Sequence, residues 1–546
     1  AATRVNADGN IEKETSNLLP YSNTFNNIAW GADDASVTGG QSGYDGTSNA
    51  WKLVGNTNAS RHHIAESISY SGVNTFSIYA KANGENYIQI ASASSTEQHA
   101  NFDLSDGSVG NVGFDFFDAK TTSLGNGWYR LSIIDKAVTN GFYISLVSSK
   151  TAGWLESWSM SNATDGILIQ DAQVEEGLVA RDVLTTTTTA LYGGITDNVP
   201  RLDYTDSSCP ALLLEPLRSN ILYHSEYFSS GGWQPYGGAV LTYNNATSPE
   251  GITNAVNMTI GGVYATFPTA ANTDYVFSLF AKTDTATSVR VNYIDQNSPF
   301  RGGAITYTFA NNTAAVTLQS ENNSVTADRE DYGNGWIRVI MKFKTNVNKN
   351  YNYQEISFSG GDGYIYGAQL EAGSYATSYI PTYGTGSVTR NADACNGLVN
   401  AGDDGIINNY NTSIFVDLEE VISNNNVIRF VTLFSTGGAS NPRVLLYGNT
   451  STILVQYRVS GQSDLTISTV YTKGNQNKVL IRLDNNKLAM FHNGNKKGEI
   501  NIVQGNNLEN LTLAENPTTD SGYRLNKLLS FPSLLTDQEA IDLTTI

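Results

Sequence analysis

The sequence predicts an all-β protein made of tandem antiparallel β-sandwich, or jelly-roll, domains with one short C-terminal helix. The composition favours strands and turns: Tyr reaches 30 residues and Gly 50, whereas charged residues make up only 15%. No stretch before residue 530 keeps a helical period over three turns. Four sequence blocks also recur in order along the 546 residues, a length that exceeds one sandwich core.

The recurring blocks indicate a duplicated domain. The first copies span residues 17–30, 76–81, 125–130 and 172–177, and the second copies span 220–233, 277–282, 333–338 and 368–373. Each block has the pattern of a strand or a tight turn, such as Asn126-Gly127 before a Trp-x-Arg strand. The distance between matching blocks changes slightly along the chain, which indicates loops of different length in the two copies. Each copy is predicted to be a jelly roll.

The chain divides into six segments on this basis. They are an N-terminal connector (1–17), repeat 1 (18–185), a second connector (186–220), repeat 2 (221–390), a linker (391–409) and a third sandwich (410–546). The second connector contains Leu212-Leu213-Leu214, which predicts an extra strand packed on a neighbouring domain. The exit of repeat 1 departs from the repeat pattern, because Ala180-Arg181-Asp182 stands where repeat 2 has Ala376-Thr377-Ser378.

The third segment has its own strand and turn signals. Ser413–Leu418 alternates apolar and polar residues, and Asn493-Gly494 marks a hairpin. Near the end, Thr536 and Glu539 have the spacing of a capping box, which predicts a short helix from about Asp537.

Charge and cysteine content exclude several classes of protein. The net charge of −19 disfavours nucleic acid as a partner. No apolar run approaches the roughly 20 residues of a membrane span, so membrane insertion is not expected. The two cysteines, Cys209 and Cys395, form neither a CxxC pair nor a disulfide framework, which argues against structural zinc.

The sequence lacks the local signatures of common enzymes, and we expect no catalytic site. It contains no GxSxG, HExxH or GxxxxGK[ST] motif. His62 and His63 are expected on opposite faces of one strand, which disfavours a shared metal. Glu175-Glu176 is a candidate acid/base pair, but only Glu175 has a counterpart in repeat 2, Glu371, so a structural hydrogen-bonding role is favoured.

Aromatic residues in one loop region of each repeat are the candidate glycan-binding residues. Trp154 and Trp158 precede the last strand of repeat 1, and Tyr351 and Tyr353 occupy the equivalent stretch of repeat 2. Sugars offer apolar C–H faces that stack on aromatic rings. The alternative is that these side chains pack a loop onto the sandwich edge. Four other tryptophans recur at matched positions and are expected in the cores: Trp30, Trp128, Trp233 and Trp336.

Calcium is the one cofactor that the sequence suggests, and it does so weakly. Gly361-Asp362-Gly363 and Gly402-Asp403-Asp404-Gly405 are oxygen-rich turns. Calcium needs six to eight oxygen ligands, which one such turn does not supply, so ordinary turns are the favoured interpretation.

Several motifs resemble those of phage tail and virion proteins. They are Gly367–Gly373, Ala376–Thr382, Val388-Thr389-Arg390 and Pro200–Tyr204 leading into Leu213–Asn220. The repeats resemble carbohydrate-binding-module jelly rolls, and the third segment is similar to concanavalin-A-like or laminin-G-like sandwiches through Phe491–Gly494 and Leu535–Glu539. Ala2–Asn6 resembles the Thr-Arg close of a repeat, which suggests a preceding domain.

The resemblance implies a non-enzymatic virion structural protein, such as a tail-fibre, tail-associated or head-fibre component. The expected partners are other virion proteins and host cell-surface glycans, and the expected location is the surface of the extracellular particle, in multiple copies or as a homo-oligomer. The alternatives are a capsid decoration protein with purely protein–protein contacts, a glycan depolymerase, or a bacterial surface adhesin.

Overall fold

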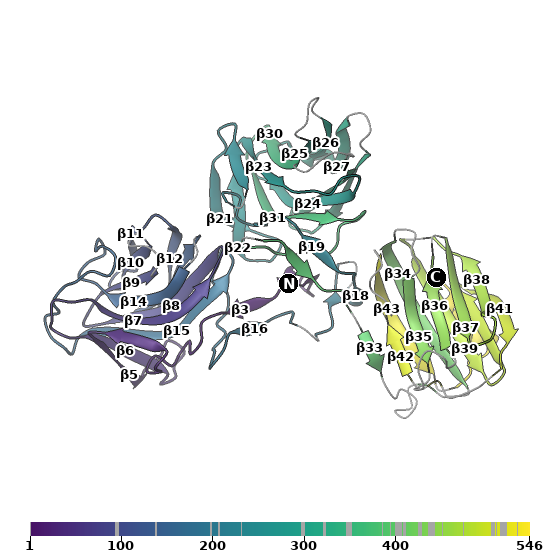
Figure 1. Ribbon diagram of the computed structural model, residues 1–546, viewed down its shortest axis with the longest axis horizontal. Helices are drawn as coiled ribbons and strands as arrows, with labels where there is room; N and C mark the ends of the chain where they lie inside the picture. Colours follow the sequence, from purple (N-terminus) through teal and green to yellow (C-terminus); the bar gives the residue numbers. More distant parts are fainter. Residues whose placement is uncertain are drawn as a thin grey trace.

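The computed structural model describes most of the chain. The residues outside the description are 1, 93–97, 137–138, 197–198, 206–207, 231, 296–300, 320–323, 346–351, 385, 394, 399–406, 408–410, 424–427, 435–442, 450, 473, 504–507, 509, 514–520 and 532. The described chain is almost entirely antiparallel β-sheet with one α-helix, α1 (Asp537–Thr544), so the predicted fold class is confirmed (Figure 1). The helix begins at the predicted capping box of Thr536 and Glu539.

Repeat 1 is a sandwich of two six-stranded sheets. One sheet has the order β11-β10-β9-β14-β7-β4 and the other β12-β13-β8-β15-β6-β5. The strands are β4 (Trp30–Asp33), β5 (Ala35–Gln41), β6 (Ala50–Gly55), β7 (His62–Tyr70), β8 (Asn74–Asn83), β9 (Tyr87–Ser92), β10 (His99–Asp103), β11 (Ser108–Val112), β12 (Phe116–Gly125), β13 (Trp128–Asp135), β14 (Thr139–Leu146) and β15 (Gly166–Glu176).

Repeat 2 has the same topology. Its sheets are β27-β26-β25-β30-β23-β20 and β28-β29-β24-β31-β22-β21, which match repeat 1 strand for strand in chain order. The strands are β20 (Trp233–Tyr236), β21 (Leu241–Thr247), β22 (Thr253–Met258), β23 (Gly261–Phe267), β24 (Asp274–Thr283), β25 (Ser288–Asp295), β26 (Arg301–Thr308), β27 (Thr313–Gln319), β28 (Val325–Asp331), β29 (Ile337–Lys344), β30 (Asn352–Ser359) and β31 (Gly363–Ala372), with a 3-10 turn at Phe309–Asn311.

The C-terminal sandwich includes two strands from the second connector. Its sheets are β17-β18-β43-β34-β39-β40-β41 and β33-β42-β35-β36-β37-β38. The strands are β17 (Leu202–Asp203), β18 (Ala211–Leu214), β33 (Cys395–Leu398), β34 (Thr412–Ser423), β35 (Ile428–Phe434), β36 (Arg443–Gly448), β37 (Thr452–Arg458), β38 (Leu465–Val470), β39 (Gln476–Asp484), β40 (Lys487–His492), β41 (Asn495–Asn501), β42 (Asn510–Leu513) and β43 (Ser521–Phe531). The strand expected at Leu212–Leu214 is therefore present, and it pairs with β43.

Each sandwich has its own apolar core, built from the inward-facing residues of its two sheets. The recurring tryptophans are buried as expected, since Trp30, Trp128, Trp233 and Trp336 are at most 4% exposed. Trp30 packs edge-on against Phe25 at 5.0 Å, and its counterpart Trp233 packs the same way against Phe228 at 5.2 Å. The duplicated blocks thus fix equivalent core contacts in both repeats.

Short β-ribbons and the N-terminal segment lie where the three sandwiches meet (Figure 1). β1 (Thr3–Val5) and β2 (Ile11–Lys13) form a hairpin. β3 (Thr15–Asn17) pairs with β16 (Leu191–Gly193), and β19 (Arg218–Asn220) pairs with β32 (Val388–Arg390) in the equivalent place of repeat 2. The strand that enters each repeat therefore pairs with the strand that follows the repeat.

Candidate glycan-binding faces

The outer face of one sheet of repeat 2 presents a row of tyrosines. In β23 and β30, Val263 and Ile356 point inward to the core, so their neighbours Tyr264 and Glu355 point outward. Tyr236, Tyr264 and Tyr353 lie side by side, with ring centroids 6.1 Å and 5.9 Å apart in that order. All three are half-buried, so part of each ring stays open to solvent.

A glycine lets one of these rings lie close against the sheet. A Cβ at Gly262 would come within 2.6 Å of the Tyr236 ring, so the ring occupies the space that a side chain would take. The Tyr236 hydroxyl donates a hydrogen bond to Glu355. Burial, together with the nearby Glu355 carboxylate, raises the pKa of Tyr236, so the hydroxyl stays protonated and the ring is fixed in place.

Polar side chains with unused hydrogen-bonding capacity lie beside the tyrosine row. Asn292 is aligned across the strands with Glu355 and Tyr264 and is only 8% exposed. No described residue donates a hydrogen bond to the Asn292 Oδ1 atom, and none accepts one from the buried Arg290 Nε. Buried polar atoms normally have partners. The face therefore combines aromatic stacking surface with an acceptor and a donor for hydroxyl groups.

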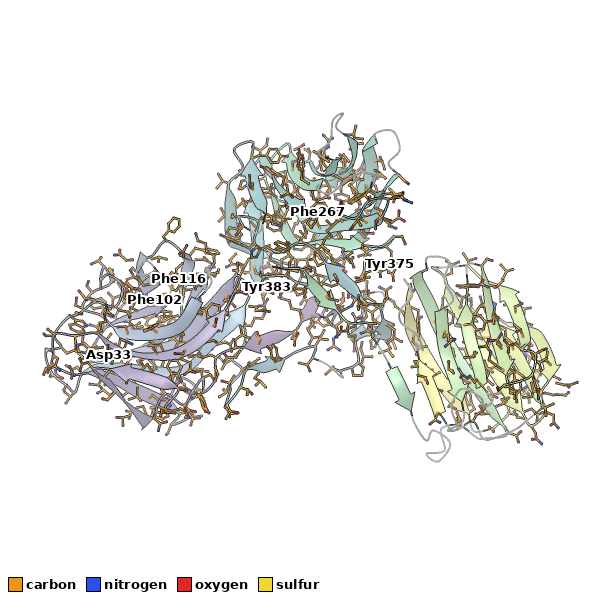
Figure 2. All side chains as sticks on the ribbon, in the orientation of Figure 1. Asp33, Phe102, Phe116, Phe267, Tyr375 and Tyr383 are labelled. Carbon is orange, nitrogen blue, oxygen red and sulfur yellow. The ribbon has the colours of Figure 1, made fainter. Side chains whose placement is uncertain are left out.

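The equivalent face of repeat 1 has a different composition. Asp33, His63 and Ser145 are aligned across β4, β7 and β14. Burial lowers the pKa of His63, whose ring packs 5.1 Å from that of Tyr143 on the same face. Figure 2 shows Asp33 on the side of repeat 1 remote from the junction, where Tyr383 lies.

Trp154 borders this face of repeat 1. The loop that carries it is held over the sheet by Gln89 and Asn101, whose amides donate to backbone carbonyls of residues 153 and 152. The Trp154 indole donates to the Ser92 carbonyl at 2.9 Å, and the Arg61 guanidinium lies 5.1 Å from its ring. This half-buried ring, with a cation beside it, is accessible to a ligand on the outer face.

The structure places the other sequence candidates differently. Trp158 packs against the core and edge-on to His62 at 5.8 Å, and its indole donates to the Leu146 carbonyl. Trp154 and Trp158 thus have separate surroundings. Tyr353 belongs to the tyrosine row, whereas Tyr351 lies outside the described residues. A ligand role for Trp154, Trp158, Tyr351 and Tyr353 stays a prediction.

The histidine pair is split between the two faces, as the alternation predicts. His62 points to the end of the core, where its ring nitrogens lie 3.0 Å from the carbonyls of Asp34 and Trp158. His63 points to the outer face. The two rings therefore have no common ligand site.

The duplicated carboxylates make the structural hydrogen bonds that the sequence favoured. Glu175 accepts from the Arg181 amide at 2.8 Å and from Gln173 at 2.9 Å. Glu371 accepts from the Thr377 amide at 3.0 Å in the equivalent position. Both side chains tie the end of a strand to the segment that leaves the repeat.

The two candidate calcium turns give no metal site within the description. The Asp362 carboxylate accepts from the Ile260 amide, and its own amide donates to Thr285, so this turn is closed by hydrogen bonds. Residues 402–405 lie outside the described chain. Among the residues that the structure describes, no three metal-ligating side chains gather. The described chain also contains no helix long and apolar enough to cross a membrane.

Sequence reasoning missed Tyr236 and Tyr264. The positions equivalent to them in repeat 1 are Asp33 and Ala65, so the tyrosines do not recur. The sequence predicts site residues in loop regions, whereas Tyr236 and Tyr264 lie on the strands β20 and β23. The signal available in the sequence was outward tyrosines beside the glycine pair Gly261-Gly262.

The fold defines a protein of tandem antiparallel β-sandwiches. No protein-family profile matches the chain, and no curated protein matches it. Among solved structures, the CBM40 domain of a Ruminococcus gnavus sialidase, bound to α2,3-sialyllactose, is 16% identical (28% of this chain, 94% of that one, TM-score 0.23). The tandem CBM22 domains of Paenibacillus barcinonensis Xyn10C are 10% identical (68% and 99%, TM-score 0.20).

A third similar structure is domains LG4–5 of the mouse laminin α1 chain, at 10% identity (55% of this chain, 91% of that one, TM-score 0.19). At these identities and TM-scores, none of the three carries an argument about the function of this chain.

Proposed function

We propose that this chain is a non-enzymatic glycan-binding component of a phage particle. The observation that carries the glycan-binding part is the row of Tyr236, Tyr264 and Tyr353 on one sheet face of repeat 2. A pyranose ring can lay its C–H face on a tyrosine, while its hydroxyls bond to Asn292 and Glu355. Polar atoms without a protein partner are satisfied by water or by a ligand, and the hydroxyl groups of a sugar stacked on the tyrosines can take that place.

The role in a virion rests on the sequence motifs at Gly367–Gly373 and Ala376–Thr382, which resemble those of phage tail and virion proteins. In this proposal the chain lies on the outside of the particle, contacts other virion proteins and binds host cell-surface glycans. Multiple copies raise the effective concentration, so sites of modest affinity suffice for adhesion.

Binding without bond cleavage fits the chemistry of the faces. Glu355, the carboxylate of the tyrosine row, accepts a hydrogen bond from Tyr236. Hydrolysis of a glycosidic bond uses two carboxyl groups on opposite sides of that bond. Tyr236, Tyr264 and Tyr353 offer surface for stacking rather than acid/base groups.

A glycan array followed by calorimetry tests the proposal. We expect the full chain to bind a defined set of glycans, and Tyr236→Ala and Tyr264→Ala each to weaken binding about tenfold, equivalent to about 1.4 kcal/mol. Tyr223→Ala is the matched control, because Tyr223 is 40% exposed and lies outside the row. Trp154→Ala tests the repeat 1 face separately.

Unchanged affinity in both tyrosine variants would remove repeat 2 as the binding site. A folded chain that binds no glycan but binds purified virion proteins would favour a purely structural decoration role. Release of shortened glycans from the array would indicate a depolymerase.

A further inference from the structure

We propose that each repeat is preceded by a β-hairpin that docks onto the domain following that repeat, and that residues 3–13 are a separable docking element for a pocket in repeat 2. This inference is independent of glycan binding. It rests on the matched positions of the two hairpins, on the contacts that they make, and on the way the equivalent region of repeat 1 is filled.

The two hairpins stand at matched positions in the duplicated sequence. β1 and β2 precede repeat 1, and β17 and β18 precede repeat 2. Ile11 stands six residues before Asn17, and Leu214 stands six residues before its counterpart Asn220. Ile11 and Leu214 are therefore equivalent residues of the two copies.

Each of these two residues is buried in the domain that follows its own repeat in the chain. Ile11 is buried among residues of repeat 2, including Phe280, Trp336 and Tyr379. Leu214 is buried in the C-terminal sandwich, where β18 pairs with β43. Each hairpin thus contributes its apolar residue to the domain after the adjacent repeat, rather than to that repeat itself.

Lys13 adds an ionic contact to the first hairpin. Its Nζ lies 2.8 Å from Glu226 Oε1 and also contacts Glu250, and the Lys13 side chain is only 3% exposed. Arg181 of repeat 1 reaches the other oxygen of Glu250 at 2.8 Å. Two cations and two carboxylates balance here, which a buried ionic cluster requires.

Three tyrosine hydroxyls complete the receptor for Lys13. Tyr366, Tyr379 and Tyr383 lie 2.9 to 3.1 Å from Glu226 Oε1 and donate to it. All three belong to repeat 2, as does Glu226. The pocket is therefore formed by repeat 2, and the hairpin supplies the apolar side chain and the ammonium group that fill it.

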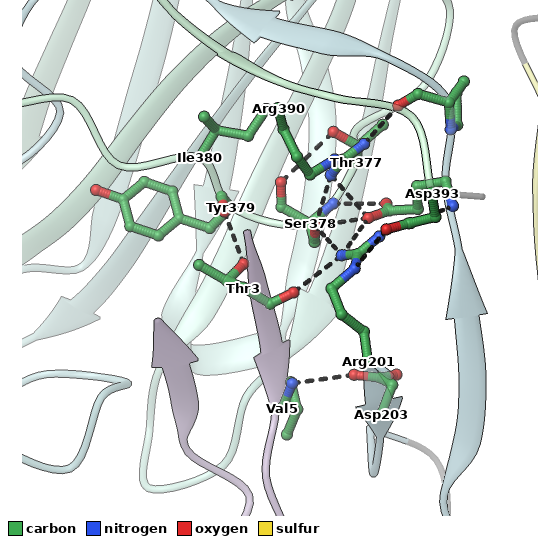
Figure 3. A network of polar contacts seen from close by, with 12 residues as sticks. Thr3, Val5, Arg201, Asp203, Thr377, Ser378, Tyr379, Ile380, Arg390 and Asp393 are labelled. Atoms are coloured by element: carbon green, nitrogen blue, oxygen red, sulfur yellow. Dashed lines mark hydrogen bonds and ion pairs between the residues drawn. The ribbon is translucent and has the colours of Figure 1, made fainter. Parts of the chain in front are cut away.

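The first strand of the hairpin is bound on two sides (Figure 3). The Thr3 hydroxyl donates to the Tyr379 carbonyl at 2.6 Å, and Arg201 donates to the Thr3 carbonyl at 3.0 Å. The Val5 amide donates to Asp203 at 3.0 Å. Repeat 2 and the second connector thus hold β1 between them.

The same region of repeat 1 is filled from within that repeat. Tyr79 and Trp128 are its counterparts of Phe280 and Trp336. The ring of Tyr44 stacks on Tyr79 at 3.8 Å, and its hydroxyl donates to Asp171. In repeat 2 the Phe280 ring packs against Tyr332 at 4.8 Å, and Ile11 of the hairpin adds an apolar side chain to this cluster.

The test adds a synthetic peptide of residues 1–14 to the otherwise full chain that lacks residues 1–13. We expect one peptide to bind per chain by calorimetry, and peptides with Ile11→Ala or Lys13→Met to bind at least about tenfold more weakly. An Asp8→Ala peptide is the control, because Asp8 lies exposed in the hairpin turn. Absence of binding to a folded truncated chain would overturn the proposal.

Full-length variants decide the matter if the truncated chain does not fold. Ile11→Ala and Lys13→Met are expected to speed hydrogen–deuterium exchange at the backbone amides of residues 3–13, because the hairpin is released from repeat 2 while a separate apolar contact keeps repeats 1 and 2 together. Lys487→Ala is the control, since Lys487 is exposed on the C-terminal sandwich and pairs with Glu499 of the same sandwich. Exchange at residues 3–13 identical to that of the unchanged chain would contradict separable docking, whatever the glycan array shows.

Discussion

At the scale of single residues, Gly262 controls how the tyrosine row meets the sheet. Its missing side chain makes room for the Tyr236 ring, and a Cβ there would also press on the Ile356 carbonyl. The position is extended backbone rather than a left-handed turn, so the need for glycine comes from space alone.

Gly262→Ala should therefore displace Tyr236 and weaken glycan binding, with a loss of about 1–3 kcal/mol in the stability of repeat 2 from overpacking. Calorimetric binding and thermal unfolding measure the two effects. Gly386→Ala is the control, because Gly386 belongs to repeat 2, lies outside the tyrosine row and has no atom within 4 Å of an added Cβ. Equal affinity in the two variants would show that the ring position does not matter.

A buried histidine makes the C-terminal sandwich sensitive to acid. Burial lowers the pKa of His492 to about 4, and its Nε2 lies 3.0 Å from Asn477 Oδ1. An unfolded histidine titrates near 6.5, so between about pH 6.5 and 4 the unfolded state binds the proton that the folded state excludes. Stability is therefore complete above pH 6.5 and falls as the pH drops toward 4.

His492→Gln should reduce this pH dependence, which is expected to be on the order of 2 kcal/mol in the unchanged chain. Urea unfolding of the C-terminal sandwich at pH 7 and at pH 4.5 measures it. The variant should lose less stability between the two values than the unchanged chain does. An equal loss in both would assign the acid sensitivity to other groups.

At the scale of elements, strand β18 connects distant parts of the chain. Leu214 is 5% exposed in the core of the C-terminal sandwich, although it belongs to the connector before repeat 2. We expect Leu214→Ala to lower the stability of the C-terminal sandwich by about 2–4 kcal/mol while repeat 2 unfolds as before. Differential scanning calorimetry separates the transitions, and Leu217→Ala, at a residue 52% exposed, is the control. A shift confined to repeat 2 would contradict the assignment.

Local patterns made most elements predictable from the sequence. The duplicated blocks, the strand at Leu212–Leu214 and the capping box at Thr536 each depend on residues close in the chain, so they were found. The docking of β1 and β2 on repeat 2 was not, because Lys13 meets Glu226 and Tyr366, whose distance in sequence hides the pairing.

The departure of repeat 1 from the repeat pattern now has a physical reason. Arg181 stands where repeat 2 has Thr377, and its guanidinium binds Glu250 across the junction. The duplicated tryptophans are thus the same in both cores, whereas the residue at the junction differs between the repeats. The tyrosine row was not predictable from the duplication, because Asp33 and Ala65 stand at the positions of Tyr236 and Tyr264 in repeat 1.

At the scale of the whole molecule, the junction sets how the outer faces of repeats 1 and 2 are held relative to each other. The Lys13 and Arg181 contacts with Glu250 join the N-terminal hairpin, repeat 1 and repeat 2 at one point. A fixed spacing between two weak sites raises the avidity for a surface that carries many ligands.

Lys13→Met should therefore speed dissociation from a glycan-coated surface while leaving the affinity for a single soluble glycan unchanged. Surface plasmon resonance at high and low glycan density distinguishes the two. A loss of equal size at both densities would indicate damage to a binding face rather than to the junction.

The pairing of β18 with β43 also bears on how the chain is synthesised. Leu212 leaves the ribosome roughly 300 residues before its partner Leu525, so one edge of the leucine-rich strand β18 has no partner while repeat 2 is synthesised, although β17 already pairs with its other edge. A chain stopped before its last strand would keep this apolar edge uncovered, and such edges promote aggregation. Chains truncated before β43 should thus be less soluble than the unchanged chain, although the apolar strand β18 itself lies in the connector before repeat 2.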